Sequence, residues 1–190
     1  DNARAASLAA AALTPTLENT NWQDYASTWF TRIRALQFGG RLEDAAGEIE
    51  RLRVWVGKTT QDERRQLDVY VVLAEADQAA ATSDDAKALP LYADAMVRAE
   101  RLGIPEDIVV VGESYVETLI KAGQIERASA IGGQVARWAD RDMRAAWTQV
   151  RLYQALHKTE AARTALDRAN LLAGERTIPG DLTAATDGFH

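Results

Sequence analysis

A glycine, a basic residue and a hydroxyl in succession can bind a phosphate group, and the sequence contains this combination at Gly57-Lys58-Thr59. A phosphate-binding loop also needs a preceding strand and a glycine five residues before this one, but Leu52 occupies that position. We therefore interpret Gly57 as a glycine that ends a helix, with Lys58 near the negative end of the helix dipole. Nucleotide binding is not expected at this motif.

A serine nucleophile can lie on a sharp turn between two glycines, and Gly112 and Ser114 supply the first half of that motif. Val116 stands where the second glycine is needed. His157 lies in an expected hairpin turn and His190 is the last residue, so neither has the spacing of a catalytic triad. An isolated histidine is more often solvated than bound to a metal ion. The sequence therefore predicts no catalytic residues, no metal site, no cofactor and no enzyme activity.

Pairs of acidic residues could act as general acid and base, but helical proteins commonly carry such pairs on their solvated faces. We interpret the acidic pairs of this sequence as solvated. Tryptophans could form a ligand cage, but they are more often packing residues between helices, with a minority left as binding anchors. The acidic pairs are Asp84-Asp85, Glu48-Glu50 and Glu113-Glu117, and the tryptophans are Trp22, Trp29, Trp55, Trp138 and Trp147.

The composition excludes several classes of protein. A chain of 190 residues is long enough for one domain with a continuous core. Apolar residues make up 47% of it, but no uninterrupted apolar stretch approaches the roughly 18 residues of a membrane helix. The net charge is -6 and basic residues alternate with acidic ones, which disfavours nucleic-acid binding because phosphates require a basic face. We therefore expect neither a nucleic-acid partner nor membrane insertion.

The compartment stays open. The sequence contains no cysteine, which excludes disulfides and thiolate metal sites but fits either the cytoplasm or the periplasm. The numbering begins at Asp1, and the first residues lack the basic start and long apolar centre of a secretory signal. Such a start fits a piece of a larger protein or a chain trimmed of a flexible segment. A periplasmic location is expected if the chain is the C-terminal sensor region of a membrane-anchored regulator.

The elements that would position any site are predicted to be helices. Glycines and prolines fall mainly between segments whose apolar residues recur three and four positions apart, as in amphipathic helices. Thr60-Gln61-Asp62-Glu63 has the pattern of a helix N-terminus, and Gly103 and Pro105 mark the end of one helix and the start of the next. The predicted helices span residues 3–13, 22–37, 42–56, 61–81, 85–102, 106–122, 125–139, 142–156 and 160–173.

Two apolar runs compete with this helical interpretation. Residues 69–72 and 108–111 are rich in β-branched and aromatic side chains, which favour strands. Each run continues without a breaker into helix-forming sequence, so we predict that both belong to buried helices.

Four alanines, Ala45, Ala88, Ala128 and Ala162, recur early in the second helix of each predicted hairpin. Their separations of 43, 40 and 34 residues are typical of repeats made of two helices. Small residues are needed where two helices cross closely, because a larger side chain would push the backbones apart. An irregular bundle, with alanines at the crossings by chance, is the alternative.

These positions and their neighbours resemble the tetratricopeptide (TPR) repeat between Trp22 and Gly174. The family pattern runs from a tryptophan through leucine-glycine, tyrosine, glycine, alanine and an aromatic to a final alanine. The leucine-glycine pair is absent from every unit and two spacings are longer, so the chain resembles a TPR-like or more general α-solenoid. The matching residues are Trp29, Gly40 and Ala45 in the first unit, Ala88, Tyr92 and Ala95 in the second, Gly123 and Ala128 in the third, where Leu119 replaces the tyrosine, and Tyr153, Ala162 and Ala169 in the fourth.

The resemblance implies an all-α fold, a right-handed superhelix of antiparallel helix pairs with about four repeats. It implies a repeat domain over residues 1–174, followed by an irregular C-terminal tail over residues 175–190. In such a stack the first helices line a concave groove. The residues expected to face the groove are Phe30, Arg34, Tyr70, Asp77, Glu113, Glu117, Trp147 and Arg151.

The same resemblance implies a non-catalytic module that binds a protein or peptide partner in its groove. We expect it to be the repeat region of a larger bacterial signalling or regulatory protein, by analogy of fold. A small-molecule-sensing domain of a regulator and a helical enzyme are the alternatives. The groove lacks the basic and asparagine set that binds a peptide carboxylate in some TPR proteins, and the terminal hairpins could self-associate.

Overall fold

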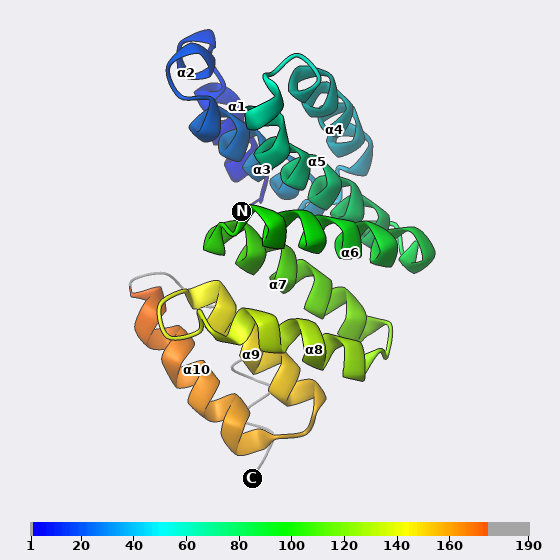
Figure 1. The fold of residues 1–190 in the computed structure, drawn as a ribbon, viewed down its shortest axis with the longest axis vertical. Helices are drawn as coiled ribbons and strands as arrows, with labels where there is room; N and C mark the ends of the chain where they lie inside the picture. The colour runs from blue at the N-terminus through cyan, green and yellow to red at the C-terminus, as the bar shows by residue number, and fades with distance from the viewer. Residues whose placement is uncertain (1, 175–190) are drawn as a thin grey trace. The chain divides into compact units, whose positions relative to one another are not determined.

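The computed structural model describes residues 2–174, and for residues 20 and 61–64 it describes the backbone alone. Over this range the chain forms helices and no strand, which confirms the predicted all-α fold (Figure 1). The helices are α1 (Asn2–Ala12), α2 (Pro15–Thr20), α3 (Trp22–Phe38), α4 (Leu42–Val56), α5 (Gln61–Ala81), α6 (Asp85–Leu102), α7 (Pro105–Lys121), α8 (Ile125–Ala136), α9 (Met143–Ala155) and α10 (Thr159–Ala173). None of the helices in this range is long and apolar enough to span a bilayer.

The sequence missed one helix and extended another. Helix α2 was not predicted, although the Thr14 hydroxyl accepts a hydrogen bond from the Leu17 amide at 3.2 Å and Pro15 is its first residue. The helix predicted over residues 125–139 ends at Ala136, because the next amides bond three residues back in successive turns. The side chains at 61–64, which carry most of the predicted N-terminal motif, and the tail 175–190, with His190, lie outside the described residues.

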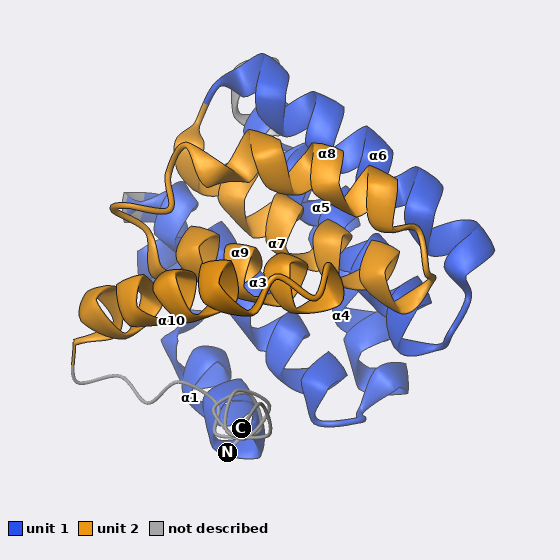
Figure 2. Ribbon diagram, turned by 90° about the horizontal axis from the view of Figure 1, so that it is seen from below, with its two compact units in different colours: residues 1–103 blue, residues 104–190 orange. Residues whose placement is uncertain are grey.

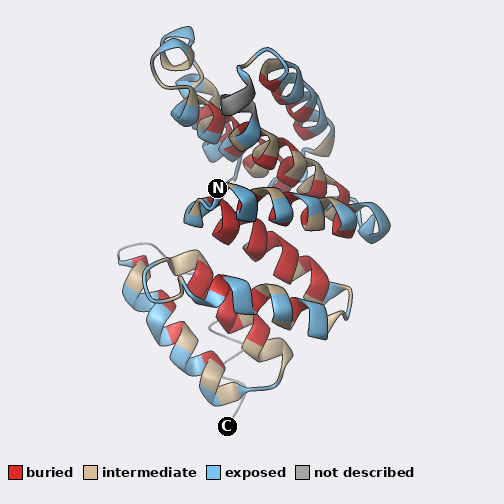
Figure 3. Cartoon of the chain, in the orientation of Figure 1, coloured by how far each residue is buried: buried red, intermediate tan, exposed pale blue. Residues whose placement is uncertain are grey.

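Both strand-like runs belong to helices, as predicted. Residues 69–72 lie in α5 and residues 108–111 lie in α7. Helix α7 is buried along most of its length (Figure 3). A helix buried on nearly every side needs apolar residues on nearly every side, which accounts for a run of four without a polar residue.

The chain divides into two compact units, unit 1 (Asp1–Gly103) and unit 2 (Ile104–His190) (Figure 2). In unit 1, α3 packs against α1, α2, α4 and α5, and α5 also packs against α4 and α6. In unit 2, α7 packs against α8 and α9, α9 also packs against α8, and α10 packs against α9. Each unit therefore contains two helical hairpins whose first helices touch. That residues 1–174 form a single repeat domain stays a prediction.

All four hairpins turn in the same way. One residue of each turn has a left-handed backbone: φ is 73° at Gly40, 60° at Ser83, 70° at Gly123 and 56° at His157. The residue after each of them donates its amide hydrogen to the carbonyl five positions before it, at 2.8 to 2.9 Å. This is the bond that closes a helix in a Schellman motif. Glycine occupies two of these four positions.

The recurring alanines follow these turns at a constant distance of five residues. Ala45, Ala88, Ala128 and Ala162 are all buried, and each donates its amide hydrogen to the carbonyl of the residue after the left-handed one. Buried residues then recur four and seven positions further along each second helix. They are Ile49 and Leu52 on α4, Tyr92 and Ala95 on α6, Gly132 and Val135 on α8, and Leu166 and Ala169 on α10.

Two glycines allow helices of unit 2 to approach closely. A Cβ atom at Gly112 of α7 would overlap Cγ2 of Val135 of α8. A Cβ atom at Gly132 of α8 would lie 2.6 Å from Cδ2 of Leu152 of α9. The other three hairpins have a large residue at the position equivalent to Gly132, namely Ile49, Tyr92 and Leu166. In the α7–α8 hairpin, Leu152 of α9 fills that space instead.

Candidate functional site

Four of the predicted groove residues lie together on α3 and α5 in unit 1. The rings of Phe30 and Tyr70 are tilted against each other with centroids 5.3 Å apart. Arg34 Nε lies 3.6 Å from Asp77 Oδ2. Asp77 also accepts a hydrogen bond from the Tyr92 hydroxyl at 2.7 Å, so the second helix of the hairpin helps to position it. These four side chains therefore lie close together, and whether they face a groove stays a prediction.

Phe38, which the sequence analysis did not select, belongs to the same surface. Its ring is 67% exposed, and the Arg34 guanidinium lies 5.2 Å from its centroid and 5.8 Å from that of Phe30. A guanidinium at this distance from two rings is attracted by both. Phe38 lies four residues after Arg34 on the same helix, and this spacing could have predicted that the two side chains are neighbours. We call Phe30, Arg34, Phe38, Tyr70 and Asp77 the α3–α5 patch.

In unit 2 the predicted residues are arranged differently. Glu117 of α7 pairs with Arg151 of α9 at 3.3 Å and with Lys121 at 2.7 Å. Trp147 is 9% exposed and packs in an apolar cluster that includes Leu166 of α10. The indole of Trp147 therefore stabilises the α9–α10 hairpin.

The two ion pairs occupy equivalent positions. Arg34, Asp77, Glu117 and Arg151 each lie six residues before the left-handed residue of their own turn. Because the first helices of a unit pack side by side, side chains at the same repeat position meet. Opposite charges at this position neutralise each other within each unit.

Charge also organises the start of α9. The Asp142 side chain caps α9 by accepting the Arg144 amide hydrogen at 2.8 Å, and the Arg144 guanidinium bonds to the same carboxylate at 3.0 Å. Burial alone would raise the pKa of Asp142. The hydrogen bonds and the charge of Arg144 lower it by a larger amount, so the pKa of Asp142 lies below its usual value. Burial lowers the pKa of Arg144, but Asp142, Glu106 and Glu113 outweigh this effect and raise it. Glu113 thus acts on Arg144 through its charge.

Aromatic side chains cluster where α3 meets α4. The rings of Tyr25, Trp29 and Trp55 have centroids 5.2 to 6.1 Å apart. The indoles of Trp55 and Trp29 donate to Glu18 at 2.7 Å and to Glu48 at 2.9 Å. Burial, and then the charges of these two carboxylates, raise the pKa of Tyr25. The rings touch each other directly, so this cluster serves packing.

Glu48 corrects the interpretation of the acidic pairs as solvated. It is 6% exposed, and besides the Trp29 indole it binds Arg32 and Arg51, each at 2.9 Å. Glu50, its partner in the pair, is exposed and bonds to Arg53. Glu48 lies three residues after Ala45, on the buried side of α4, and this position was the signal that it would be covered.

The motifs considered for catalysis lie in ordinary helical positions. Gly57 follows α4 and donates its amide hydrogen to the Arg53 carbonyl at 3.0 Å, as a helix-ending glycine does. Ser114 is buried inside α7, and His157 is exposed in the turn before α10. Among the side chains that the structure describes, no group of three or more histidine and acidic residues is arranged to hold a metal ion.

Comparison with known proteins identifies a similar fold. No protein-family model matches the sequence, and no curated protein matches it. The structure is similar to the crystal structure of BtubC (BKLC) from P. vanneervenii, with a TM-score of 0.65. The sequence identity is 14%, over 97% of this chain and 77% of that chain. At this identity the likeness shows a shared fold alone.

Proposed function

We propose that the chain is a TPR-like helical-repeat module, a right-handed stack of antiparallel helix pairs, that binds a protein or peptide partner. The recurring hairpin carries the repeat part of this proposal. A left-handed residue, a bond closing the first helix and a buried alanine five residues later occur in all four hairpins. The chain is then the repeat region of a larger bacterial signalling or regulatory protein, as its resemblance to such regions implies.

The α3–α5 patch is the binding surface that we propose. Aromatic and arginine side chains dominate the energetics of protein interfaces. The patch exposes the Phe38 ring and parts of Tyr70 and Arg34, while Phe30 is only 5% exposed and packs beneath them. Arg34 and Asp77 already neutralise each other, so net charge in the patch is small. The partner is therefore a peptide segment held mainly by an apolar or aromatic side chain against Phe38 and Tyr70.

The test begins with peptides selected from a random display library on the purified chain, and their Kd is then measured with two patch variants. Phe38→Ala and Tyr70→Ala should each weaken the selected peptides about fivefold or more, since truncation of an anchor costs at least about 1 kcal/mol. Phe38 is 67% exposed, so its variant should keep the helical circular dichroism signal.

Val54→Ala is the matched control. Val54 is an exposed apolar residue on α4, a second helix, and lies outside the patch. Its variant should bind the selected peptides as the unsubstituted chain does. Equal binding by Phe38→Ala, Tyr70→Ala and the unsubstituted chain would exclude the α3–α5 patch as the binding surface.

A further inference from the structure

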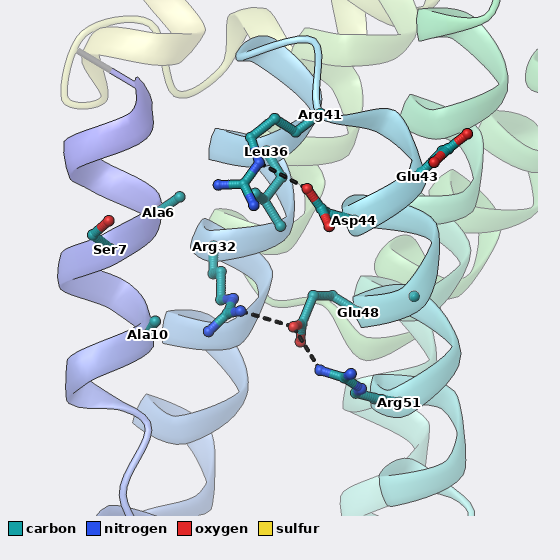
Figure 4. Close-up of a pocket in the computed structure, with 11 residues that line it drawn as sticks. Ala6, Ser7, Ala10, Arg32, Leu36, Arg41, Glu43, Asp44, Glu48 and Arg51 are labelled. Atoms are coloured by element: carbon teal, nitrogen blue, oxygen red, sulfur yellow. Dashed lines mark hydrogen bonds and ion pairs between the residues drawn. The ribbon is translucent and has the colours of Figure 1, made fainter.

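A hollow of about 390 Å³ lies beside α1, α3 and α4 in unit 1 (Figure 4). Its α1 wall consists of small side chains, Ala6, Ser7 and Ala10, which leave room beside the helix. Arg32 lines it from α3, Arg41 from the turn after α3, and Arg51 from α4. Its remaining lining residues are Leu36, Glu43, Asp44, Gly47 and Glu48.

Each of the three guanidiniums forms an ion pair with a carboxylate of the same lining. Glu48 Oε1 bridges Arg32 and Arg51 at 2.9 Å each, while its other oxygen accepts from the Trp29 indole. Asp44 accepts a hydrogen bond from Arg41 Nε at 2.8 Å. Figure 4 shows Arg32 and Arg41 in the space between α1 and α4. Arg32 is the most restrained of the three, because 27% of its side chain is exposed, and a restrained arginine recognises a ligand at a lower cost in side-chain entropy than a mobile one.

The hollow has more hydrogen-bond donors than acceptors. Each guanidinium carries five N–H groups and no acceptor, and the lining contains three of them. Arg32 Nε is buried and has no hydrogen-bond partner. Both Glu48 oxygens already accept hydrogen bonds, and Figure 4 shows Glu43 directed away from the arginines. The lining also holds three carboxylates, those of Glu43, Asp44 and Glu48, so its formal charge is zero. The group that would complete this site is therefore one that accepts hydrogen bonds from the remaining guanidinium N–H groups.

We propose that this hollow binds one oxyanion group, a carboxylate or a phosphate, between Arg32 and Arg41, with Arg51 at its edge. Planar guanidiniums bind both groups through paired N–H donors. The site is separate from the α3–α5 patch, because Arg32 and Arg34 are two residues apart on α3 and their side chains project about 160° apart, from nearly opposite sides of the helix. Loss of one site would therefore leave the other intact.

The experiment follows the indole N–H resonance of Trp29 by NMR, assigned with Trp29→Phe, during titration with inorganic phosphate or sodium acetate. Trp29 reports on the hollow because it shares Glu48 with Arg32 and Arg51. Sodium chloride keeps the ionic strength constant. The Trp29 resonance should shift and saturate, and the Trp138 resonance in unit 2 should not respond.

Two variants test whether the proposed arginines bind the anion that causes the shift. Arg41→Gln and Arg32→Gln should each raise the Kd at least tenfold. Arg41 is 57% exposed, so its variant should fold even if Arg32→Gln does not. Arg163→Gln is the matched control, since Arg163 is 59% exposed and also pairs with an acidic residue three positions away. It should leave the Kd unchanged.

The choice of anion identifies the source of the ligand. Saturation by phosphate alone indicates a phosphorylated ligand, whereas saturation by acetate and by a short glutamate-containing peptide indicates an acidic peptide. Either outcome supports the oxyanion site. A Trp29 resonance that does not saturate with either anion, or an unchanged Kd in Arg41→Gln, would overturn it.

Discussion

Ser83 and His157 occupy backbone conformations that side chains disfavour. The left-handed region costs a residue with a Cβ atom about 1 to 2 kcal/mol, and both residues lie there with φ of 60° and 56°. Glycine avoids this cost but loses about 0.5 to 1 kcal/mol through its more flexible unfolded state. We therefore expect Ser83→Gly and His157→Gly each to stabilise the fold by about 0.5 to 1 kcal/mol, measured by urea unfolding.

The reverse substitution tests the same explanation. Gly123 has φ of 70° and nothing within 4 Å of the position that a Cβ atom would take. Gly123→Ser should therefore destabilise the chain by a similar amount, through backbone strain alone. A stabilising Gly123→Ser would show that left-handed geometry is not what these turns require.

Glu48 and Glu50 differ sharply in their effect on folding, although both pair with arginines on α4. Removing a carboxylate bonded to buried or charged donors leaves those donors without a partner, at about 1.5 to 3 kcal/mol. Glu48→Ala should therefore lower the free energy of unfolding by about 2 to 3 kcal/mol. Glu50 is 59% exposed, so Glu50→Ala should change it by less than about 0.5 kcal/mol. Equal effects in urea unfolding would contradict the bridging role of Glu48.

At the scale of the helix pair, Gly112 sets how closely α7 and α8 approach. A methyl group there would overlap Val135, which is buried and has a stiff, branched side chain. Gly112→Ala should destabilise the chain by about 1 to 3 kcal/mol through overpacking, despite the better helix propensity of alanine. The midpoint of urea unfolding measures this effect.

Gly133 of α8 supplies the control for helix propensity. It is exposed, and a Cβ atom there would meet nothing within 4 Å. Gly133→Ala should therefore stabilise the chain by about 0.5 to 1 kcal/mol. A gain of stability in both variants would mean that α7 and α8 do not pack as closely as described.

The sequence predicted the helices well because glycine, proline and apolar spacing act locally. Almost every predicted end lies within one residue of the observed end, and the short helix α2 was the omission. Burial of Glu48 and Trp147 was harder to predict, because it depends on which side of a helix its neighbours cover. The hollow with Arg32 was not predicted, since it requires α1 to pack against α3, a contact between separate elements.

For the whole molecule, the sequence predicted the all-α fold class. Arg34 and Asp77 of the α3–α5 patch meet because each lies six residues before the left-handed residue of its own turn, on first helices that pack side by side. The division into two compact units was not predicted, because it reflects contacts summed over the chain.

Circular dichroism checks the fold of the whole chain in solution. The spectrum should be predominantly helical, because residues 2–174 contain ten helices and no strand. A strand content above about one fifth, the average for globular proteins, would contradict the all-α fold. The same measurement provides the folding control for every variant proposed above.

The recurring turns bear on how such a sequence diverges. Four turns share one backbone geometry, yet Gly40, Ser83, Gly123 and His157 carry it with three residue types. A residue other than glycine is tolerated in the turn when the packing of the hairpin compensates for the free-energy cost of its left-handed backbone. A profile that scores amino-acid identity therefore loses information at these positions faster than the fold changes. In recurring hairpins of this kind, the backbone dihedral angles of the turn are therefore more uniform than the residues that adopt them.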